Sequence, residues 1–304
     1  MLWKKLGHIF KVNNDNEFLK THAANPLPIQ LDEKIFRVFY SGRDKNNRSS
    51  VGYVDLNLDT LKIVNYPKEP VFTYGNENSF YSHGVSIGNM YQDLDGKCFI
   101  LFMGWQIREN QHWRGDIGRL MLINKEKLIL NPTNPFLKLD NEDPISLSYP
   151  FVLFHNNEFK MWYGSTITWN AENGEMIHVI KYVTSYDGTT WKKHGIAIPY
   201  EIGKAQAFSR PCVVIDSNGF HMWYSFRKGD GTKYRIGYSH SLDGVNWIRK
   251  DELVGIDVSK NLEDWDSEML CYPFVFDHNG KRYMLYNGNS FGKEGFGLAI
   301  LEQD

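Results

Sequence analysis

The feature that most constrains the fold of this chain is a strand-like segment that recurs along it. Each copy is an apolar run that ends in a small or polar turn, and successive copies start about 60 residues apart. That spacing suits blades of about four strands with elaborated loops. The five copies are Phe36–Arg43, Phe99–Trp105, Phe159–Ser165, Phe220–Arg227 and Tyr283–Asn289.

A second strand precedes each copy, and in three copies it carries a matching phrase at Ser148–Pro150, Ser209–Pro211 and Cys271–Pro273. Looser versions occur at His22–Ile29 and His83–Ile87. Helical periodicity is weak throughout. The repeats therefore predict an all-β fold, a five-bladed β-propeller that forms one domain over residues 1–304.

A third strand follows in each copy, and two of these strands end in the phrase Ser-x-Asp-Gly-x-x-Trp, at Ser185–Trp191 and Ser241–Trp247. Asp-Gly favours a hairpin turn, and Ser and Asp can accept hydrogen bonds from the backbone of that turn. We interpret the phrase as structural. At the chain ends, Trp3–Phe10 is predicted to be the outer strand of a blade whose inner strands come from Tyr283–Leu301, so that the N- and C-terminal strands close one blade.

The composition limits the classes of function. Aromatic residues make up 15% of the chain, which favours strands and is also what carbohydrate sites use. The net charge of −2 and the absence of a long basic run predict no nucleic-acid partner. We find no apolar run of signal-peptide or membrane length, and three widely spaced cysteines fit reduced thiols, so we expect a cytoplasmic protein with no membrane partner. No phosphate-binding loop, dinucleotide fingerprint or metal-ligand spacing is found, and we expect no cofactor and no metal.

The candidate site follows from the propeller geometry, because the innermost strand of each blade lines the central channel. Glu268 stands out because it precedes an apolar strand, where an unpaired carboxylate is costly. Each candidate also has a purely structural interpretation. Ser148 and Ser209 would cap strand ends, and Arg210 would form an ion pair between blades. Asp266 would hold a turn, and His22 and His83 would be core residues. The candidate catalytic residues are His22, His83, Asp266 and Glu268, and the candidate substrate-binding residues are Arg43, Trp105, Ser148, Ser209, Arg210, Arg227, Tyr272 and Asn287.

Several landmarks carry a resemblance to a known family: Trp3–Phe10, Ser41–Asp44, the Ser-x-Asp-Gly-x-x-Trp phrases, Trp265–Glu268 and Gly295–Ala299. At these residues the chain resembles the five-bladed propeller glycoside hydrolases, the clan that contains families 32, 43, 62 and 68. It is most similar to uncharacterised glycosidase-like proteins of surface-polysaccharide gene clusters. The resemblance implies a carbohydrate or nucleotide-sugar ligand and a role in surface-polysaccharide metabolism.

The same resemblance implies three carboxylates on the inner strands of the first three blades, since hydrolysis needs one carboxyl group to protonate the leaving oxygen and another to attack or to activate water. At the matching places this chain has His22 and Asn25, then Phe80–Gly84, then Ser148. The standard triad is therefore absent.

Two interpretations remain open. In one, a glycosidase-like enzyme acts on a glycosidic or sugar-phosphate bond with Glu268 and Asp266, while His22 or His83 transfers a proton and Arg43 or Arg210 holds an anionic group. In the other, the pocket binds or modifies a sugar or nucleotide-sugar without hydrolysing it.

A third class is a propeller that binds protein at its rim. The segments Trp105–Trp113 and Ile167–Asn170 are the candidate rim loops, and we favour the interpretation that they fold over the pocket as a lid.

Overall fold

The computed structural model describes residues 1–13 and 15–303, and nearly all of its regular structure is β-strand. Over these residues the strands pair antiparallel in five groups of four. The first group is β2 (Thr21–Gln30), β3 (Ile35–Arg43), β4 (Ser49–Asn57) and β5 (Lys62–Asn65); the second is β6 (Gly84–Gln92), β7 (Cys98–Ile107), β8 (Trp113–Ile123) and β9 (Lys127–Leu130).

The third group is β10 (Leu147–His155), β11 (Glu158–Thr168), β12 (Ile177–Ser185) and β13 (Lys192–Ile196); the fourth is β14 (Ala207–Asp216), β15 (Gly219–Arg227), β16 (Arg235–Ser241) and β17 (Ile248–Arg249); the fifth is β18 (Cys271–His278), β19 (Lys281–Asn287), β20 (Gly295–Gln303) and β1 (Leu2–Lys11). A 3-10 turn, η1 (Asp251–Leu253), and a short turn labelled α1 (Asn289–Gly292) complete the described elements. None of the described helices is long and apolar enough to span a membrane.

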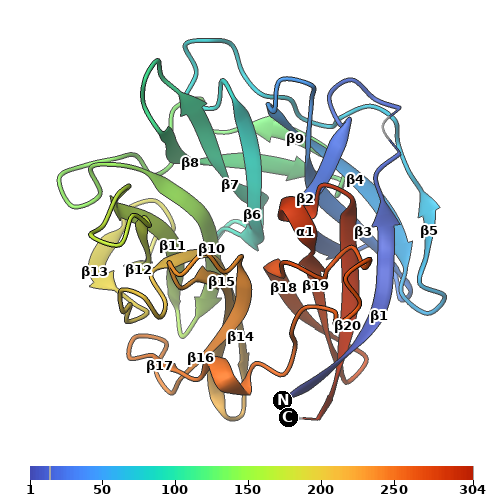
Figure 1. Ribbon diagram of the computed structural model, residues 1–304. Coiled ribbons are helices and arrows are strands. Elements are labelled where there is room, and N and C mark those ends of the chain that lie inside the picture. The colour runs from blue at the N-terminus through green and yellow to red at the C-terminus, as the bar shows by residue number, and fades with distance from the viewer. Residues whose placement is uncertain (14, 304) are drawn as a thin grey trace.

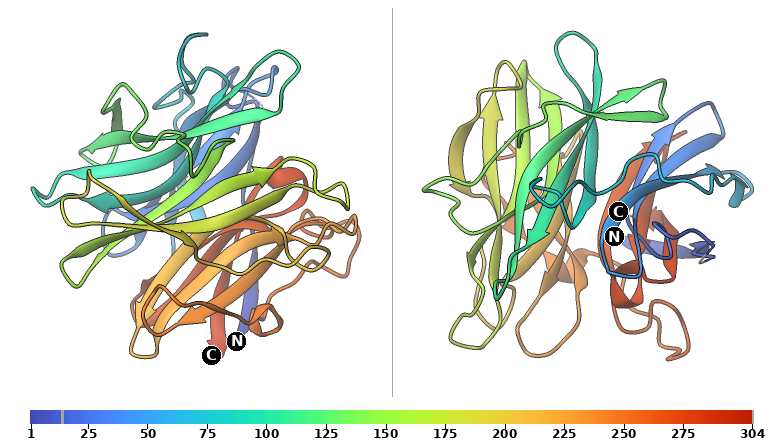
Figure 2. Two further views of the ribbon diagram at one scale, coloured as in Figure 1. Left: turned by 90° about the vertical axis from the view of Figure 1, so that its left-hand side faces the viewer. Right: turned by 90° about the horizontal axis from the view of Figure 1, so that it is seen from above.

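The first strands of the groups lie together in the middle of the molecule (Figure 1). Each of β2, β6, β10 and β14 contacts the first strand of the next group, and β18 contacts β2 in turn. The hydrogen-bonded sheets do not follow this circle completely, because single parallel bridges join only the first group to the second and the third to the fourth. The views from the side and from above show the groups splayed outward from this middle (Figure 2).

The two ends of the chain share the fifth group. β1 pairs antiparallel with β20, with Trp3 opposite Leu301, and the two termini lie side by side (Figures 1 and 2). Trp3 is buried and packs edge-on against Trp223, with 6.1 Å between ring centroids. The predicted pairing of the terminal strands is confirmed.

Every first strand carries a break in register at the same place, which lies between Ala24 and Leu27 in β2, and at the matching positions in the other four. These breaks behave as β-bulges, which bend a strand and change the direction of a side chain. The residues at the bulges are Asn25, Gly88, Tyr149, Arg210 and Tyr272, and the four that are not glycine have φ between 38° and 58°. A proline follows each of those four, which fits a position with no ladder hydrogen bond.

The Ser-x-Asp-Gly-x-x-Trp phrases form the turns that the sequence predicts. Ser185 Oγ accepts the N–H of Gly188 at 2.9 Å, and Ser241 Oγ accepts the N–H of Gly244 at the same distance. Trp247 at the end of the second phrase is buried and meets Trp162 edge-on at 5.9 Å. The phrase is structural, and it anchors the outer part of the third and fourth groups.

Candidate functional site

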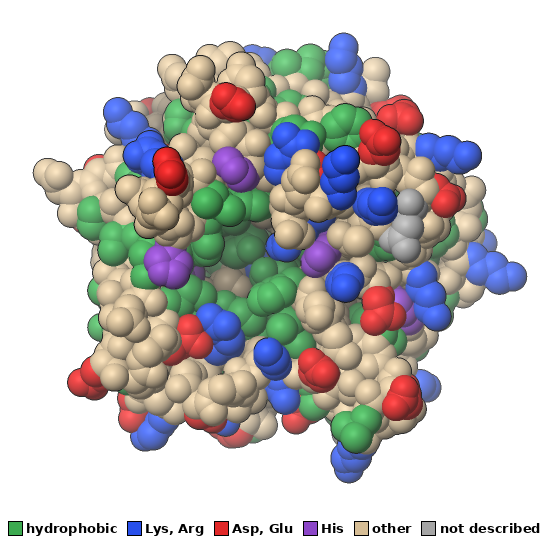
Figure 3. Space-filling model, turned by 45° about the horizontal axis from the view of Figure 1, so that its top comes forward, with side chains coloured by type: hydrophobic (Ala, Val, Ile, Leu, Met, Phe, Trp, Pro, Cys, Tyr) green, Lys and Arg blue, Asp and Glu red, His purple; other side chains and the backbone are tan. Residues whose placement is uncertain are grey.

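A cavity of 430 Å³ opens where the first strands meet. Seen in space-filling form, it is a hollow lined mainly by hydrophobic side chains (Figure 3). Its wall combines aromatic rings with a few polar groups, the usual make-up of a small-molecule site. The lining residues are Arg43, Asn47, Ser86, Met103, Trp105, Ile107, Trp113, Tyr149, Met176, His178, Ser209, Arg227, Tyr234, Tyr272 and Phe291. We call this the central cavity; no aspartate or glutamate is among the described residues that line it.

Two indole rings on the wall are held by their neighbours. Trp105 Nε1 donates to Ser49 Oγ at 2.9 Å, which fixes the ring at the end of β7. Trp113, at the start of β8, meets Trp169 edge-on at 4.8 Å, and Trp169 in turn stacks on His112 at 4.9 Å. The predicted rim loops therefore contact each other at the cavity, and the segment Trp105–Trp113 supplies part of the wall.

Two bulge residues, Tyr149 and Tyr272, line the central cavity. The hydroxyl groups of Tyr149 and Tyr272 are 3.1 Å apart. Arg210, the bulge residue of β14, is fully buried and donates to the carbonyl oxygens of Pro26 at 2.8 Å and Ile87 at 3.4 Å. Burial lowers the pKa of its guanidinium to about 10. Arg210 does not line the cavity; it ties the fourth group to the first and second.

The predicted site residue Ser148 has a buried histidine, His178, as its hydrogen-bond partner. His178 Nε2 is 2.6 Å from Ser148 Oγ, and its Nδ1 is 2.8 Å from Thr166 Oγ1. Desolvation lowers the pKa of His178 to about 3, so its ring is neutral near neutral pH. Sequence reasoning missed this histidine because it lies on a third strand, whereas the search followed the innermost strands.

Three polar groups at the wall have no hydrogen-bond partner among the described residues. The Oγ of Ser209 is buried, and it has no hydrogen-bond partner among the described residues. Arg227 pairs with Glu175 at 2.8 Å and lies over the ring of Tyr234, but its Nε is buried without a partner in the described part of the chain. Arg43 is half-buried, and no hydrogen bond or ion pair joins its side chain to another described residue.

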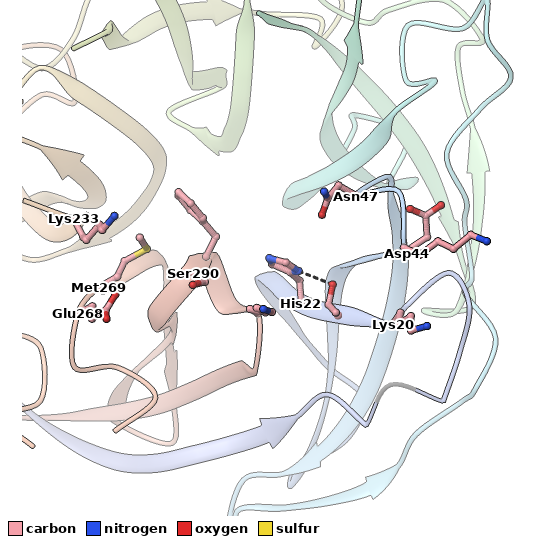
Figure 4. A pocket seen from close by; sticks show the side chains of 12 residues that line it. Lys20, His22, Asp44, Asn47, Lys233, Glu268, Met269 and Ser290 are labelled. Atoms are coloured by element: carbon pink, nitrogen blue, oxygen red, sulfur yellow. Dashed lines mark hydrogen bonds between the residues drawn. The ribbon is translucent and has the colours of Figure 1, made fainter. Parts of the chain in front are cut away.

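A second hollow of 560 Å³ adjoins the central cavity, because Asn47 and Phe291 line both. We call it the lysine hollow, and Figure 4 shows its side chains. Its remaining lining residues are Lys20, Thr21, His22, Asp44, Lys45, Lys233, Glu268, Met269, Ser290 and Lys293. Figure 3 shows lysine and arginine side chains beside the hydrophobic hollow.

Two predicted catalytic residues, His22 and Glu268, lie in the lysine hollow. His22 is buried, and its Nδ1 is 2.9 Å from Thr21 Oγ1. Desolvation, with a smaller contribution from the charges of Arg43 and Lys293, lowers its pKa to about 3. Glu268 is exposed, in contrast to the burial that its position before an apolar strand led us to expect.

The loop after β3 brings side chains to both hollows. Asp44 Oδ1 accepts the N–H groups of Asn46 and Arg48, each at 2.8 Å, and its Oδ2 accepts from Arg48 Nε at 2.9 Å. Asn47 sits in this loop with φ of 61°. Asp44 therefore has a structural partner and holds the loop that carries Arg43, Lys45 and Asn47.

The other predicted residues lie outside both lining sets. Asp266 is buried, pairs with Lys5 Nζ at 2.7 Å and accepts from the Tyr286 hydroxyl at 3.1 Å. Asn287 Nδ2 donates to the carbonyl oxygens of Ala23 and Gly295, and its Oδ1 accepts the N–H of Asn25. His83 Nδ1 accepts the N–H of Ile107 at 3.3 Å beside the Trp105 ring.

The structure thus divides the predicted site residues into three sets. It brings Arg43, Trp105, Ser209, Arg227 and Tyr272 together in the central cavity. His22 and Glu268 share the lysine hollow. The remaining five, His83, Ser148, Arg210, Asp266 and Asn287, line neither.

The fold is that of known glycoside hydrolases. A solved structure described as a glycoside hydrolase matches 99% of this chain and 93% of its own, with a TM-score of 0.77 and 13% identity. A member of the GH130 family, in a study of mannoside phosphorylases and glycoside hydrolases that target β-1,2 mannosidic linkages, matches with a TM-score of 0.71 and 14% identity over 98% of this chain and 93% of its own. At such identities the likeness concerns the fold.

No family model matches the sequence. Two curated relatives, the uncharacterized proteins MT1551 and Rv1502 of Mycobacterium tuberculosis strains CDC 1551 and H37Rv, are each 40% identical over 306 residues, which is 99% of this chain and 100% of theirs. The chain belongs to the same family as these mycobacterial proteins.

Proposed function

We propose that the protein is a single-domain, five-bladed propeller that binds a saccharide in its central cavity and does not use the two-carboxylate chemistry of glycoside hydrolases. One observation carries the proposal: the described residues that line the cavity include Trp105, Trp113 and three tyrosines, but no carboxylate. The circle of contacts among the first strands supports the architecture. A place in surface-polysaccharide metabolism and a cytoplasmic location stay predictions from the sequence.

The chemistry of the wall supports sugar binding. Indole rings offer flat apolar faces, and the half-buried Arg43 side chain offers a polar group that no described residue uses. Ser209 Oγ and Arg227 Nε lie buried behind this wall without a partner among the described residues. Hydrolysis with two carboxylates requires both groups within about 5–10 Å of each other across the scissile bond. Glu175, which contacts the wall residue Arg227, is held in an ion pair with it, and Asp44, next to the wall residue Arg43, is held by Arg48. Recognition without hydrolysis is therefore the function that this cavity supports best.

The test is a titration of the protein with a panel of mono- and oligosaccharides, followed by tryptophan fluorescence, with product analysis after long incubation. We expect a saturable change in fluorescence and no released sugar. Trp105→Leu should abolish the change, whereas Trp191→Leu, which alters a tryptophan packed against Phe136, should keep it. Release of a monosaccharide, or an unchanged titration in Trp105→Leu, contradicts the proposal.

A second candidate function is turnover in the lysine hollow, and it is favoured by the placement of Glu268 and His22 in one cavity. Glu268 is the exposed carboxyl group of this hollow and would carry the proton transfer, whereas the lowered pKa of His22, about 3, makes its ring a weak base near neutral pH and leaves it a positioning role. Glu268→Gln would then abolish product formation, with Glu263→Gln, an exposed neighbour, as the matched control. Equal activity of the two variants would exclude this candidate.

A further inference from the structure

We propose that the saccharide carries a phosphoryl group and that this group lies in the lysine hollow while the sugar lies in the central cavity. The ligand class is therefore a sugar phosphate or a sugar linked to a nucleoside diphosphate. This inference rests on the proposed function for the sugar half of the ligand, and it adds the anionic half.

The first argument is the charge of the lysine hollow. Lys20, Lys45, Lys233 and Lys293 line it, and no salt bridge joins any of them to another described residue. The two acidic residues on the same wall are Asp44, which is held by Arg48, and Glu268. The chain as a whole has 34 basic and 36 acidic residues, so this hollow has the opposite sign to the molecule that contains it.

Several lysines elsewhere in the described chain form ion pairs with buried aspartates. Lys181 and Lys193 both pair with the buried Asp143, and Lys5 pairs with the buried Asp266. These cations stabilise the fold. The four lysines of the hollow are exposed and have no such partner, so their charges are available to an anion that comes from solution.

Positive charges at the hollow also act on His22, although burial has the larger effect on its pKa. His22 lies among the lysines, and after desolvation the charges of Arg43 and Lys293 are the next causes of its lowered pKa. A field that disfavours a proton on His22 favours an anion at the same place.

The second argument is geometry. Asn47 and Phe291 line both hollows, so one ligand can pass from the indole rings to the lysines. The ring of Phe291 packs on Tyr234 and Tyr272, with centroids 5.9 and 6.1 Å away, and is thereby fixed at the junction. Arg43, which has no partner among the described residues, lies on the central wall near this junction.

The number of cations distinguishes phosphoryl groups from a carboxylate. A uronate carries one negative charge, whereas a phosphate monoester carries nearly two at neutral pH and offers three acceptor oxygens. The four lysines of the hollow, with Arg43 on the adjoining wall of the central cavity, supply more positive charge than one carboxylate needs, which favours a phosphoryl group and favours a diphosphate more. Lysine is a common point-charge ligand of phosphate.

The experiment is isothermal titration calorimetry of the full chain with matched ligands: hexoses, the corresponding hexose 1-phosphates, glucuronate, UDP- and GDP-hexoses, and inorganic pyrophosphate. We expect a hexose 1-phosphate to bind about tenfold or more tightly than its parent hexose at low ionic strength, with the advantage reduced in about 0.5 M salt. A nucleotide sugar that binds more tightly still identifies the diphosphate as the source; a hexose 1-phosphate that binds best identifies the monophosphate.

The variant that tests the site is Lys233→Gln with Lys293→Gln, and its control is Lys127→Gln with Lys192→Gln, which changes the net charge equally at exposed positions on outer strands. We expect the first pair to weaken pyrophosphate and phosphorylated sugars about tenfold and the control pair less than twofold. Equal effects of the two pairs, equal affinity for hexose and hexose phosphate, or a uronate as good as a phosphate would overturn the inference.

These outcomes separate the inference from the proposed function. Binding of neutral sugars that needs Trp105 but gains nothing from a phosphate refutes the inference alone. Binding of phosphorylated ligands that needs the lysines but is unchanged in Trp105→Leu refutes the sugar site in the central cavity.

Discussion

Two arginines near the central cavity, Arg210 and Arg43, differ in their burial and in their partners. Arg210 is fully buried, donates to two backbone carbonyls and fixes three first strands against one another. Arg43 is half-buried, lines the cavity and has no partner among the described residues. A buried cation with satisfied donors serves the fold, while a cation whose donors face a cavity without partners is available to a ligand. The contrast separates positions that support the ring of strands from positions that recognise the ligand.

We expect the largest effect, a loss of stability, when the buried Arg210 is replaced. Arg210→Met removes the donors to Pro26 and Ile87 and leaves two buried carbonyl oxygens unpaired, so we expect a loss of about 2–4 kcal/mol in the free energy of unfolding. Urea denaturation measures it. Arg43→Met should change the same quantity by less than about 0.5 kcal/mol. Similar losses in both variants would remove the distinction.

The buried histidines make the stability of the fold depend on pH. Burial lowers the pKa of His178 from 6.5 to about 3, so the folded state binds a proton at this ring less readily than the unfolded chain does. The resulting contribution to the free energy of unfolding is fully present above pH 6.5 and is lost as the pH falls from 6.5 toward 3. Between pH 6.5 and pH 5 this amounts to about 2 kcal/mol for one histidine. His178→Gln should therefore flatten the dependence of unfolding free energy on pH by about one proton. An unchanged slope would show that His178 does not carry this effect.

On the ligand side, Arg43→Met should weaken a phosphorylated saccharide about 10- to 30-fold, because a charged hydrogen bond contributes about 1.5–2 kcal/mol. Calorimetry at low ionic strength measures it. Arg43→Lys keeps the charge and should recover part of the affinity. If Arg43→Met binds like the unmodified protein, Arg43 is not part of the recognition surface.

The smallest effect has the opposite sign. Glu268 is the carboxylate of the lysine hollow whose side chain has no cationic partner among the described residues, and it opposes an anionic ligand. Glu268→Gln should therefore strengthen pyrophosphate binding about twofold, less so in high salt. Weaker binding in this variant would indicate that Glu268 donates to or positions the ligand, as the enzymatic candidate requires.

Much of the fold could be predicted from the sequence, because its determinants are local and repeated. Ser185 and Ser241 satisfy their own turns within three residues, so the phrase predicts the turn wherever it occurs. The pairing of Trp3–Phe10 with the C-terminal strands followed from the need to complete one group. The phrases at Ser148 and Ser209 mark the repeated bulges, although the bulges themselves were not predicted.

The candidate site was less accessible to sequence reasoning, because its partners are far apart along the chain. Lys5 and Asp266 are separated by 261 residues, so nothing local indicated that this carboxylate is paired. His178 and Trp113 reach the cavity from third strands, which the search along the innermost strands did not include. The lysines of the hollow come from four separate segments, and only the fold brings them together.

The most direct test is a crystal structure of the protein with a nucleoside-diphosphate sugar. The account predicts the sugar ring within about 4 Å of Trp105 or Trp113, and phosphoryl oxygens within about 3 Å of at least two of Lys20, Lys45, Lys233 and Lys293. A ligand bound on another face of the molecule, or a sugar in the lysine hollow with the central cavity unused, would contradict it.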